Sequence, residues 1–294
     1  MIEKLPIMHL KVYMKSECKI ELPFWLSSTI RGAIGTELIK YLCCMEKKAE
    51  CESCNDLFNC SVKILYHTGS QNKSDVIINP YIIHCENGLV NGSEICFDII
   101  LFGEGIKTYT DIFRVLSRGL KLGVIRESFK LIKIDNVLKN QSVFDGAMWV
   151  KPESSFLEKT PENISVDKIK VKFLSMYNAK QKNIEAFDFD YFIRGCMRRV
   201  SAVLNQSNIS MDVNFKKLLE SAKDVKTVEK KLNYTTLKRF SNRTGTKQEI
   251  QGIEGSITFE GNITPFLEFL KLSEVIGVGK LCVMGLGKIQ VDYL

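Results

Sequence analysis

The sequence predicts an α+β protein made of tandem ferredoxin-like (RRM-like) domains. Three observations carry this prediction. Residues 1–143 show the order strand, helix, strand, strand, helix, strand; residues 162–294 show that topology again; and residues 144–161 form a polar linker with two prolines. With 294 residues in total, each half is long enough to bury a core of its own.

Six elements are expected in the N-terminal domain. In chain order they cover residues 7–14, 27–42, 76–84, 93–102, 111–122 and 129–137. The first is a strand because apolar and polar residues alternate from Met8 to Met14, which turns His9 away from the core. The first helix takes Ser27 or Ser28 as its cap, and the second ends at Gly123.

The C-terminal domain is expected to repeat this order. Its predicted elements are a strand, a helix, glycine-interrupted strands, a short helix and a last strand, over residues 168–173, 188–204, 251–259, 265–274 and 281–293. The last strand would close a C-terminal glycine-rich hairpin. The repetition is one of topology, because the two halves share no visible sequence repeat.

Positive charge is concentrated in one segment. The chain carries a net charge of +7, and residues 216–247 hold ten Lys or Arg against three Asp or Glu, so the remainder is neutral. We interpret residues 216–247 as a basic insertion that grips an anionic polymer. A solvated, lysine-rich helix and loop is the alternative.

The composition is that of a globular protein, with 45% hydrophobic and 26% charged residues. No stretch has the apolar run of a signal peptide or of a membrane span. These features predict a cytoplasmic protein without a membrane partner.

Four of the ten cysteines form the spacing Cys44-x6-Cys51-x2-Cys54-x5-Cys60. Clustered thiols with one C-x-x-C pair are typical of zinc ligands in a reducing compartment, so residues 43–60 are expected to form a small cysteine-rich insertion with a structural zinc. Because the second pair is spread out, reduced thiols that pack a small knob are the alternative.

Two Gly-x-Gly-Lys steps lie in a glycine-rich loop over residues 277–288. Gly277 and Gly279 precede Lys280 in the first, and the second is Gly285-Leu286-Gly287-Lys288. Such steps let a backbone turn tightly and approach phosphates, and the lysines add charge. A nucleotide P-loop is excluded because Lys280 is not followed by Ser or Thr. A glycine-rich hairpin that serves packing alone is the alternative.

These motifs together resemble a known family. The paired Gly-x-Gly-Lys steps are similar to the signature loop of the CRISPR-associated repeat-RNA-processing endoribonucleases, which belong to the repeat-associated mysterious protein (RAMP) superfamily. Residues 30–35 with the following cysteines resemble the first helix of one cysteine-cluster branch of that family. Residues 238–243 are similar to its basic Arg-aromatic-Ser segment, and residues 251–255 to the hairpin after it. The resemblance covers nearly the whole chain and implies tandem ferredoxin-like domains.

The resemblance also implies a function. The protein would bind and cleave CRISPR repeat RNA in precursor transcripts and so generate guide RNAs. The 2′-hydroxyl would attack the adjacent phosphate, and catalysis would need no metal or other cofactor. The implied partners are CRISPR repeat RNA and other CRISPR-associated subunits.

This reaction requires a base, an acid and positive charge near the phosphate. Histidine suits the first two roles, but residues 26–44 contain none. His67 is the first candidate, and Tyr41 beside Lys40 or Tyr234 with Lys238 are the others.

The expected RNA contacts are basic, hydroxyl-bearing and glycine residues: Arg31, Arg194, Arg198, Lys238, Arg239, Ser241, Arg243, Lys247, Gly277, Gly279, Lys280, Gly285, Gly287 and Lys288. Tyr234 and Phe240 are interleaved with the basic residues and offer aromatic faces on which unpaired bases can stack.

Three of these arginines have an alternative interpretation. Arg194 and Arg198 fit equally well on a solvated helix face, where they would pair with Asp190 or Glu185. Arg31 lies within the first helix and either faces RNA or pairs with Glu37.

Two other functions stay open at this stage. A non-catalytic RNA-binding RAMP subunit of a CRISPR effector complex is favoured by the histidine-poor first helix. A zinc-dependent nucleic-acid regulator would require the cysteine knob to contact DNA.

Overall fold

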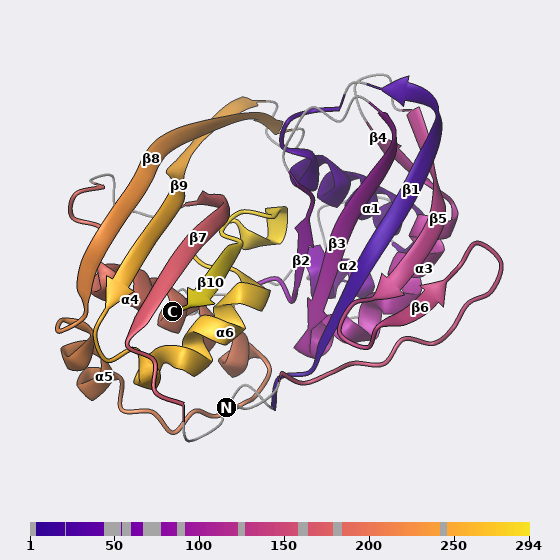
Figure 1. Cartoon of the computed structure of the whole chain (residues 1–294). Coiled ribbons are helices and arrows are strands. Elements are labelled where there is room, and N and C mark those ends of the chain that lie inside the picture. The colour runs from indigo at the N-terminus through magenta and orange to yellow at the C-terminus, as the bar shows by residue number, and fades with distance from the viewer. Residues whose placement is uncertain are drawn as a thin grey trace. The chain divides into compact units, whose positions relative to one another are not determined.

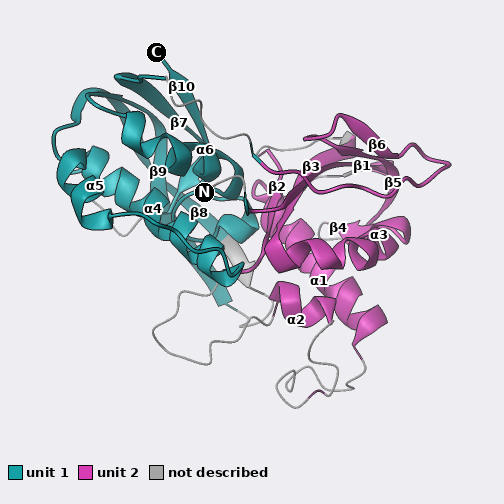
Figure 2. Cartoon of the chain, turned by 90° about the horizontal axis from the view of Figure 1, so that it is seen from below, with its two compact units in different colours: residues 1–4, 157–294 teal, residues 5–156 magenta. Residues whose placement is uncertain are grey.

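The computed structural model describes residues 4–20, 22–43, 54, 60–66, 78–86, 92–122, 127–157, 164–178, 184–241 and 246–294. The chain divides into two compact units (Figure 2). We call residues 5–156 the N-terminal unit, and residues 157–294 with residues 1–4 the C-terminal unit. The division between Phe156 and Leu157 falls within the segment assigned above to a linker.

The N-terminal unit is a sheet with helices on one face (Figures 1 and 2). Its elements are β1 (Ile7–Ile20), α1 (Leu26–Leu42), α2 (Ser61–Tyr66), β2 (Tyr81–His84), β3 (Gly92–Phe102), the 3-10 helix η2 (Gly103–Thr108), α3 (Tyr109–Ser117), β4 (Leu120–Leu122), β5 (Glu127–Asn136) and β6 (Gln141–Phe144). The strand order is β2-β3-β1-β5-β4, with β6 paired to β5, and all pairs are antiparallel. This is the ferredoxin-like order, so the predicted fold is confirmed for this half.

The alternation predicted for the first strand is present in β1. Leu10, Val12 and Met14 are fully buried, and Lys11 between them is exposed. The buried side chains lie on the face that the helices cover, and α1 contributes Ile30, Ile34 and Leu38 to the same core. A period of two in the sequence was therefore sufficient to orient this strand.

Two local predictions in this unit are wrong. The helix expected over 111–122 ends at Ser117, and residues 120–122 form β4, because Gly119 takes a φ of +86° that an L side chain rarely adopts. Leucines spaced four apart fit a helix and leucines spaced two apart fit a strand, so the pattern was ambiguous. The N-cap position of α1 is Trp25, without a side-chain cap bond, in place of the predicted Ser27 or Ser28. The Ser27 hydroxyl instead donates to the carbonyl of Cys85 at 3.3 Å and accepts from the amide of Cys85 at 2.8 Å.

Residues 145–156 of the expected linker belong to the N-terminal unit. Ser155 pairs with Ile7 through both backbone bonds, at 2.7 and 2.8 Å. Trp149 stacks on Phe144, with ring centroids 4.4 Å apart. This segment is therefore packed against β1 and β6.

The C-terminal unit repeats the architecture. Its elements are β7 (Lys168–Tyr177), α4 (Phe189–Gln206), α5 (Phe215–Ala222), β8 (Lys226–Ser241), β9 (Thr246–Glu260), the 3-10 helix η3 (Thr264–Phe266), α6 (Leu267–Ile276), the 3-10 helix η4 (Cys282–Met284) and β10 (Ile289–Tyr293). The strand order β10-β7-β9-β8 is again ferredoxin-like and antiparallel. Asp188 caps α4 by accepting from the amide of Tyr191 at 2.8 Å, as the predicted helix start requires.

Two features of this unit differ from the sequence prediction. The basic segment 216–247 is not an insertion, because it supplies α5, the edge strand β8 and the start of β9. The strand expected over 281–293 covers only Ile289–Tyr293, and residues 277–288 form a loop with one 3-10 turn in place of a hairpin.

Among the described residues, no helix has the length and apolar character that crossing a membrane requires.

Candidate nucleic-acid interface

The glycine-rich loop joins α6 to β10, and its shape depends on its glycines. Gly277, Gly279, Gly285 and Gly287 all have φ between 72° and 82°, in the left-handed region that favours glycine. A Cβ on Gly287 would overlap the carbonyl oxygen of Val278. The glycines are thus required for the fold of the loop itself, whatever else they do.

Most of the loop is turned inward. The amides of Val278, Lys280 and Gly287 donate to backbone carbonyls at 2.8–3.1 Å, and the amide of Lys288 donates to a serine hydroxyl at 2.9 Å. Three of the four glycines are buried, and only Gly279 is half-exposed. Of the loop residues predicted to contact RNA, Lys280 is exposed and Gly279 and Lys288 are half-exposed, so the accessible part of the loop is set by these three residues.

The loop packs against the end of β7. A Cβ on Gly279 would lie 2.7 Å from the ring of Tyr177 and 2.8 Å from the carbonyl oxygen of Asn178. Tyr177 pairs with Ile253 of β9, and Ile253 pairs with Tyr234 of β8. Since neighbouring strands are about 4.8 Å apart, the loop lies on the order of two strand spacings from Tyr234.

Beyond the end of β7, the strands β8 and β9 continue as a two-stranded ribbon, which we define as residues 235–241 and 246–252. These residues pair only with each other in the sheet. The side-chain amide of Asn178 donates to the carbonyl of Gln251 at 2.8 Å, which ties the ribbon to the end of β7. The ribbon and the glycine-rich loop therefore lie at the same end of this sheet.

The ribbon carries the basic and aromatic residues singled out in the sequence. Tyr234, directly before it, is 37% exposed, and Lys238 and Lys247 are exposed. The backbones of Arg239 and Ser241 pair in β8. Their side chains, and all of Arg243, lie outside what the structure describes.

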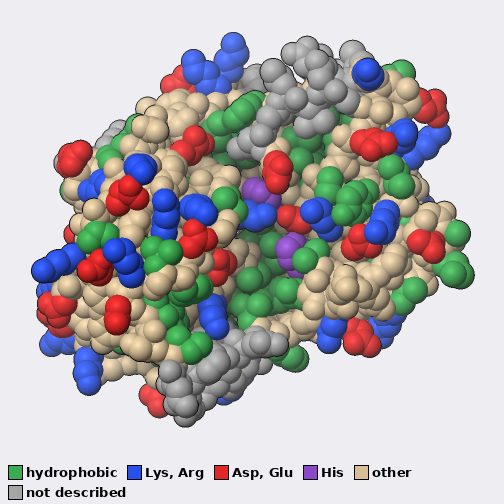
Figure 3. All heavy atoms as spheres, in the orientation of Figure 1, with side chains coloured by type: hydrophobic (Ala, Val, Ile, Leu, Met, Phe, Trp, Pro, Cys, Tyr) green, Lys and Arg blue, Asp and Glu red, His purple; other side chains and the backbone are tan. Residues whose placement is uncertain are grey.

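Part of the positive charge is neutralised within the unit. The ammonium groups of Lys223, Lys231 and Lys238 lie 3.1, 2.6 and 3.3 Å from carboxylates of Glu220, Glu229 and Glu249. Basic and acidic side chains are accordingly interspersed on the face drawn in Figure 3. The charge count over 216–247 overstated the free positive charge because it omitted Glu249 on the antiparallel partner strand. Lys247 has no ion-pair partner among the described side chains.

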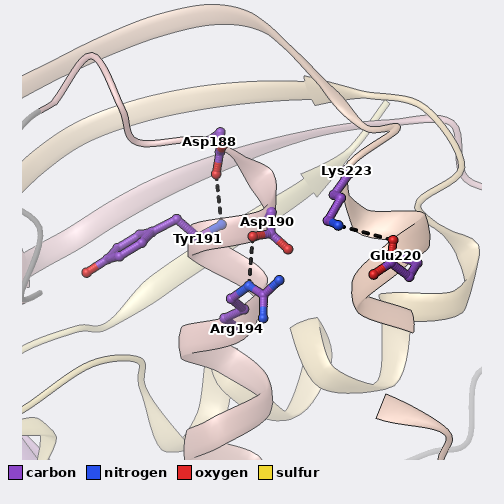
Figure 4. Close-up of polar contacts among 6 residues, drawn as sticks. All are labelled: Asp188, Asp190, Tyr191, Arg194, Glu220 and Lys223. Carbon is purple, nitrogen blue, oxygen red and sulfur yellow. Dashed lines mark hydrogen bonds and ion pairs between the residues drawn. The ribbon is translucent and has the colours of Figure 1, made fainter. Parts of the chain in front are cut away.

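The two arginines predicted on the second-domain helix lie on α4 but differ in their partners. Arg194 Nε is 2.7 Å from Asp190 Oδ2, one turn earlier on the helix (Figure 4). Arg198 is exposed and has no carboxylate within ion-pair distance among the described residues. The neighbouring Arg199 donates from Nε to the carbonyl of Ile276 at 3.1 Å, at the end of α6 where the glycine-rich loop begins. Arg199 thus positions the loop.

Tyr41 in the N-terminal unit lies beside two cations. Its side chain is 42% exposed and is not part of the buried stripe of α1. The guanidinium carbon of Arg118 lies 3.8 Å from the ring centroid, and the ammonium of Lys40 lies 4.9 Å from it. Arg118 follows α3 and is distant in the sequence, so no sequence signal linked it to Tyr41.

Arg31 is engaged within the unit. Its guanidinium carbon lies 4.7 Å from the ring centroid of Tyr66 and 5.9 Å from that of Tyr81. The Tyr66 hydroxyl donates to the Arg31 carbonyl at 2.7 Å, and burial raises the pKa of Tyr66 well above its ordinary value. Glu37 lies 3.8 Å from Lys40 instead.

Of the three histidines, His67 lies outside the described residues. His9 Nε2 is 3.2 Å from Asp98 Oδ1 on β3. His84, at the end of β2, is 6% exposed. The two described histidines therefore both belong to the sheet of the N-terminal unit.

The predicted metal site falls largely outside the described residues, since these include Cys54 and Cys60 but not Cys44 or Cys51. Within the described part of the chain, no cluster of three or more His, Cys, Asp or Glu could hold a metal ion. The structural zinc therefore stays a prediction from the sequence.

Two family models match the chain, one in each half. Residues 171–289 match the family model of the CRISPR-associated endoribonuclease Cas6, and residues 5–158 match a family model described as an N-terminal domain. The Cas6 match begins in β7 and ends in β10, so it contains both the ribbon and the glycine-rich loop. No curated protein sequence matches the chain.

Solved structures share the fold at low sequence identity. A Cas6 product complex superposes with a TM-score of 0.59 at 13% identity, covering 98% of this chain and 100% of its own. Thermus thermophilus Cas6 superposes with a TM-score of 0.59 at 12% identity, covering 98% of this chain and 99% of its own. A partial Cas6-RT-Cas1–Cas2 complex gives 0.60 at 14% identity over 100% of this chain and 47% of its own.

The tandem ferredoxin-like units, together with the glycine-rich loop and cationic ribbon of the second, give this chain the fold of the solved Cas6 structures. Residues 171–289, which contain the loop and the ribbon, are similar to the family of the CRISPR-associated endoribonuclease Cas6.

Proposed function

We propose that this protein cleaves CRISPR repeat RNA in precursor transcripts without a metal ion and so generates guide RNAs. The observation that carries the proposal is the convergence of the glycine-rich loop and the cationic ribbon at one end of a sheet, inside the segment that matches Cas6. The exposed lysines of the ribbon and the partly exposed Tyr234 directly before it suit a single-stranded nucleic acid.

The chemical step is an intramolecular transfer at phosphorus. The 2′-oxygen loses its proton to a base and bonds to the adjacent phosphorus, while the bond from phosphorus to the 5′-oxygen breaks. An acid protonates that leaving oxygen. The products are a 2′,3′-cyclic phosphate and a 5′-hydroxyl, and no oxidant or water is consumed.

The cluster of Tyr41, Arg118 and Lys40 supplies the groups that this step needs. A phenol hydroxyl can exchange a proton, and the two cations beside it can offset the charge that develops on the phosphate oxygens. His67 remains a candidate for the base, and Tyr234 with Lys238 for a second acid–base pair.

Relatives show the class of partner that we propose. One solved Cas6 is a product complex, and another is assembled with RT, Cas1 and Cas2. We extend both to this chain, with repeat RNA as the substrate and other CRISPR proteins as the partners. The same role is consistent with a cytoplasmic location.

The test uses purified protein, the host's repeat RNA and excess EDTA. Cleavage is expected in EDTA, with a cyclic phosphate on the upstream fragment, and is expected to stop when the scissile nucleotide is 2′-deoxy. Cleavage of the deoxy substrate, or a strict requirement for Mg²⁺, would refute the proposed attack.

A non-catalytic RNA-binding subunit is the second candidate. It is favoured by the placement of both described histidines, since His9 contacts Asp98 and His84 is buried. Tight binding of repeat RNA without product, unchanged by His67→Ala, would support this candidate over the nuclease.

A further inference from the structure

A pocket of about 270 Å³ lies between α4 and α5 of the C-terminal unit. None of its lining residues belongs to the glycine-rich loop. Its walls combine basic, hydroxyl and apolar side chains, from Arg194, Met197, Arg198, Ser201, Phe215 and Leu219. This volume lies just below the ~300–1,000 Å³ typical of small-molecule sites. It suits a single small aromatic group with a charged substituent.

The apolar wall is held in place by its neighbours. Phe215 opens α5, whose start is capped by Asn214 accepting from the amide of Lys217 at 3.0 Å. The Phe215 ring also packs on Phe269 of α6, with centroids 6.2 Å apart. Because Phe215 and Leu219 are one turn apart, they face the same side of α5.

The basic wall is partly preorganised and partly unpaired. Asp190 holds Arg194 through Nε, and Glu220 on the facing helix is held by Lys223 at 3.1 Å (Figure 4). The carboxylates of Asp190 and Glu220 are thereby ion-paired with Arg194 and Lys223. Arg198, one turn beyond Arg194, contributes an exposed guanidinium with no carboxylate partner among the described residues.

We propose that this pocket binds one nucleotide of the RNA chain, with the base against Phe215 and Leu219 and the phosphate on Arg198. A guanidinium matches a phosphate with two parallel hydrogen bonds, and an aromatic ring accepts the face of any base. The proposal rests on the proposed function for the identity of the RNA. It adds a nucleotide site on the helices of the C-terminal unit, apart from the ribbon.

The first test measures adenosine monophosphate binding by NMR titration of the full-length protein, which does not depend on repeat-RNA activity. Saturable binding is expected in the wild type. It should weaken at least tenfold in Arg198→Ala and in Ser201→Trp, which fills the pocket without changing its charge. Lys217→Ala is the matched control, because this substitution removes one positive charge outside the pocket. Lys217 lies about 200° around α5 from Phe215.

The second test measures affinity for repeat RNA with a 2′-deoxy scissile nucleotide. Arg198→Ala and Ser201→Trp should each weaken binding by about three- to tenfold relative to Lys217→Ala. Equal losses in Arg198→Ala and Lys217→Ala would overturn the site, since they would indicate general attraction to positive charge. Binding of an oligoglutamate peptide with no binding of the monophosphate would also overturn it, in favour of an acidic protein partner.

The two proposals can fail separately. If repeat RNA is neither bound nor cut but the monophosphate still binds in the pattern above, the nuclease proposal fails and the nucleotide site stands. If RNA is cleaved normally while all three variants bind the monophosphate like the wild type, the nucleotide site fails alone.

Discussion

Gly287 and Gly32 occupy opposite environments at the scale of single residues. Gly287 has a φ of +72°, and a Cβ there would overlap the Val278 carbonyl, whereas Gly32 is in α1 with nothing within 4 Å of the position a Cβ would take. We expect Gly287→Ala to lower the free energy of unfolding by at least ~2 kcal/mol. Gly32→Ala should raise it by ~0.5–1 kcal/mol, because alanine is the better helix former. Urea unfolding of both variants measures the two changes in unfolding free energy. Equal changes would show that strain in the loop does not explain the loss of stability in Gly287→Ala.

Tyr41 and Arg118 give the residue-scale prediction for catalysis. Tyr41→Phe removes only the hydroxyl, and Arg118→Ala removes the cation 3.8 Å from the ring centroid. Each should lower the single-turnover cleavage rate by about 10²-fold, the size of a proton-transfer or charge-stabilising contribution. Arg114→Ala is the control, because Arg114 lies on α3 and pairs at the surface with Asp111 at 3.1 Å. A rate for Tyr41→Phe equal to that of the wild type would remove Tyr41 from the mechanism.

Glu274 carries a prediction on pH. Burial raises the pKa of its carboxyl above the ordinary value of 4.5, and the group lies in the last turn of α6, where the helix dipole opposes negative charge. The folded state therefore binds this proton more tightly than the unfolded state, so the stabilising contribution is complete below pH 4.5 and is lost as pH rises through the folded pKa.

Glu274→Gln keeps the oxygen that accepts from the Val291 amide at 2.8 Å. It should raise the urea midpoint at pH 8 by an amount worth about 0.5 kcal/mol and leave it unchanged at pH 4. Glu260→Gln is the opposite control, because a hydrogen bond from Lys168 lowers the pKa of Glu260, so this substitution should lower stability at pH 8. An equal rise in the urea midpoint of Glu274→Gln at both pH values would contradict a raised pKa for Glu274.

At the scale of elements, the ribbon at the end of β8 and β9 carries two of the exposed lysines that are predicted to contact RNA, Lys238 and Lys247. Lys247 is exposed there without an ion-pair partner among the described side chains, whereas Lys231 on the same sheet lies 2.6 Å from Glu229. The ribbon continues beyond the end of β7, where its two strands pair only with each other in the sheet. Position in the sheet therefore separates two lysines that look alike in the sequence.

We expect Lys247→Ala to weaken binding of repeat RNA and to reduce the slope of log affinity against log salt concentration by about one. Lys231→Ala should change that slope much less, because its charge is already paired. Fluorescence anisotropy between 50 and 300 mM salt, roughly the range over which phosphate contacts are lost, distinguishes the two. Identical slopes for both variants would show that the ribbon is not the phosphate contact.

At the scale of the whole molecule, the candidate groups are divided between the two units. The ribbon, the glycine-rich loop and the α4–α5 pocket belong to the C-terminal unit, and the Tyr41 cluster belongs to the N-terminal unit. Each unit has its own antiparallel sheet and buried core. We therefore expect RNA binding by the C-terminal unit to be separable from cleavage.

Expressed alone, residues 157–294 should unfold cooperatively in urea and retain repeat-RNA binding, within about tenfold of the full chain, but should not cleave. The reason is that the cationic ribbon is intact while Tyr41 and Arg118 are absent. Circular dichroism measures the unfolding of the isolated unit, and fluorescence anisotropy measures its binding of repeat RNA. Cleavage by the isolated unit would move the active site onto Tyr234 and Lys238.

The sequence by itself determined the architecture of this protein, because the periodicity of buried residues is local. Alternation in β1 and helical spacing in α4 are visible in short windows, and the glycines of the loop mark positions where a positive φ is permitted. The same local information misassigned residues 111–122 and 281–288, where helix and strand patterns coincide or a loop folds on itself.

Only the tertiary structure decided which charges are available and which side chains meet. Glu249 reaches Lys238 across a strand pair, and Arg118 reaches Tyr41 from the end of another helix. The amides of Gly287 and Lys288 in the glycine-rich loop donate to residues of β7. The contact of Arg118 with Tyr41 and the bonds from the loop to β7 join residues far apart in the chain, and Glu249 meets Lys238 only through the register of β8 and β9. The energies of these contacts depend on distance and burial rather than on sequence spacing. The chemistry of the site therefore becomes apparent only once the sheets have formed.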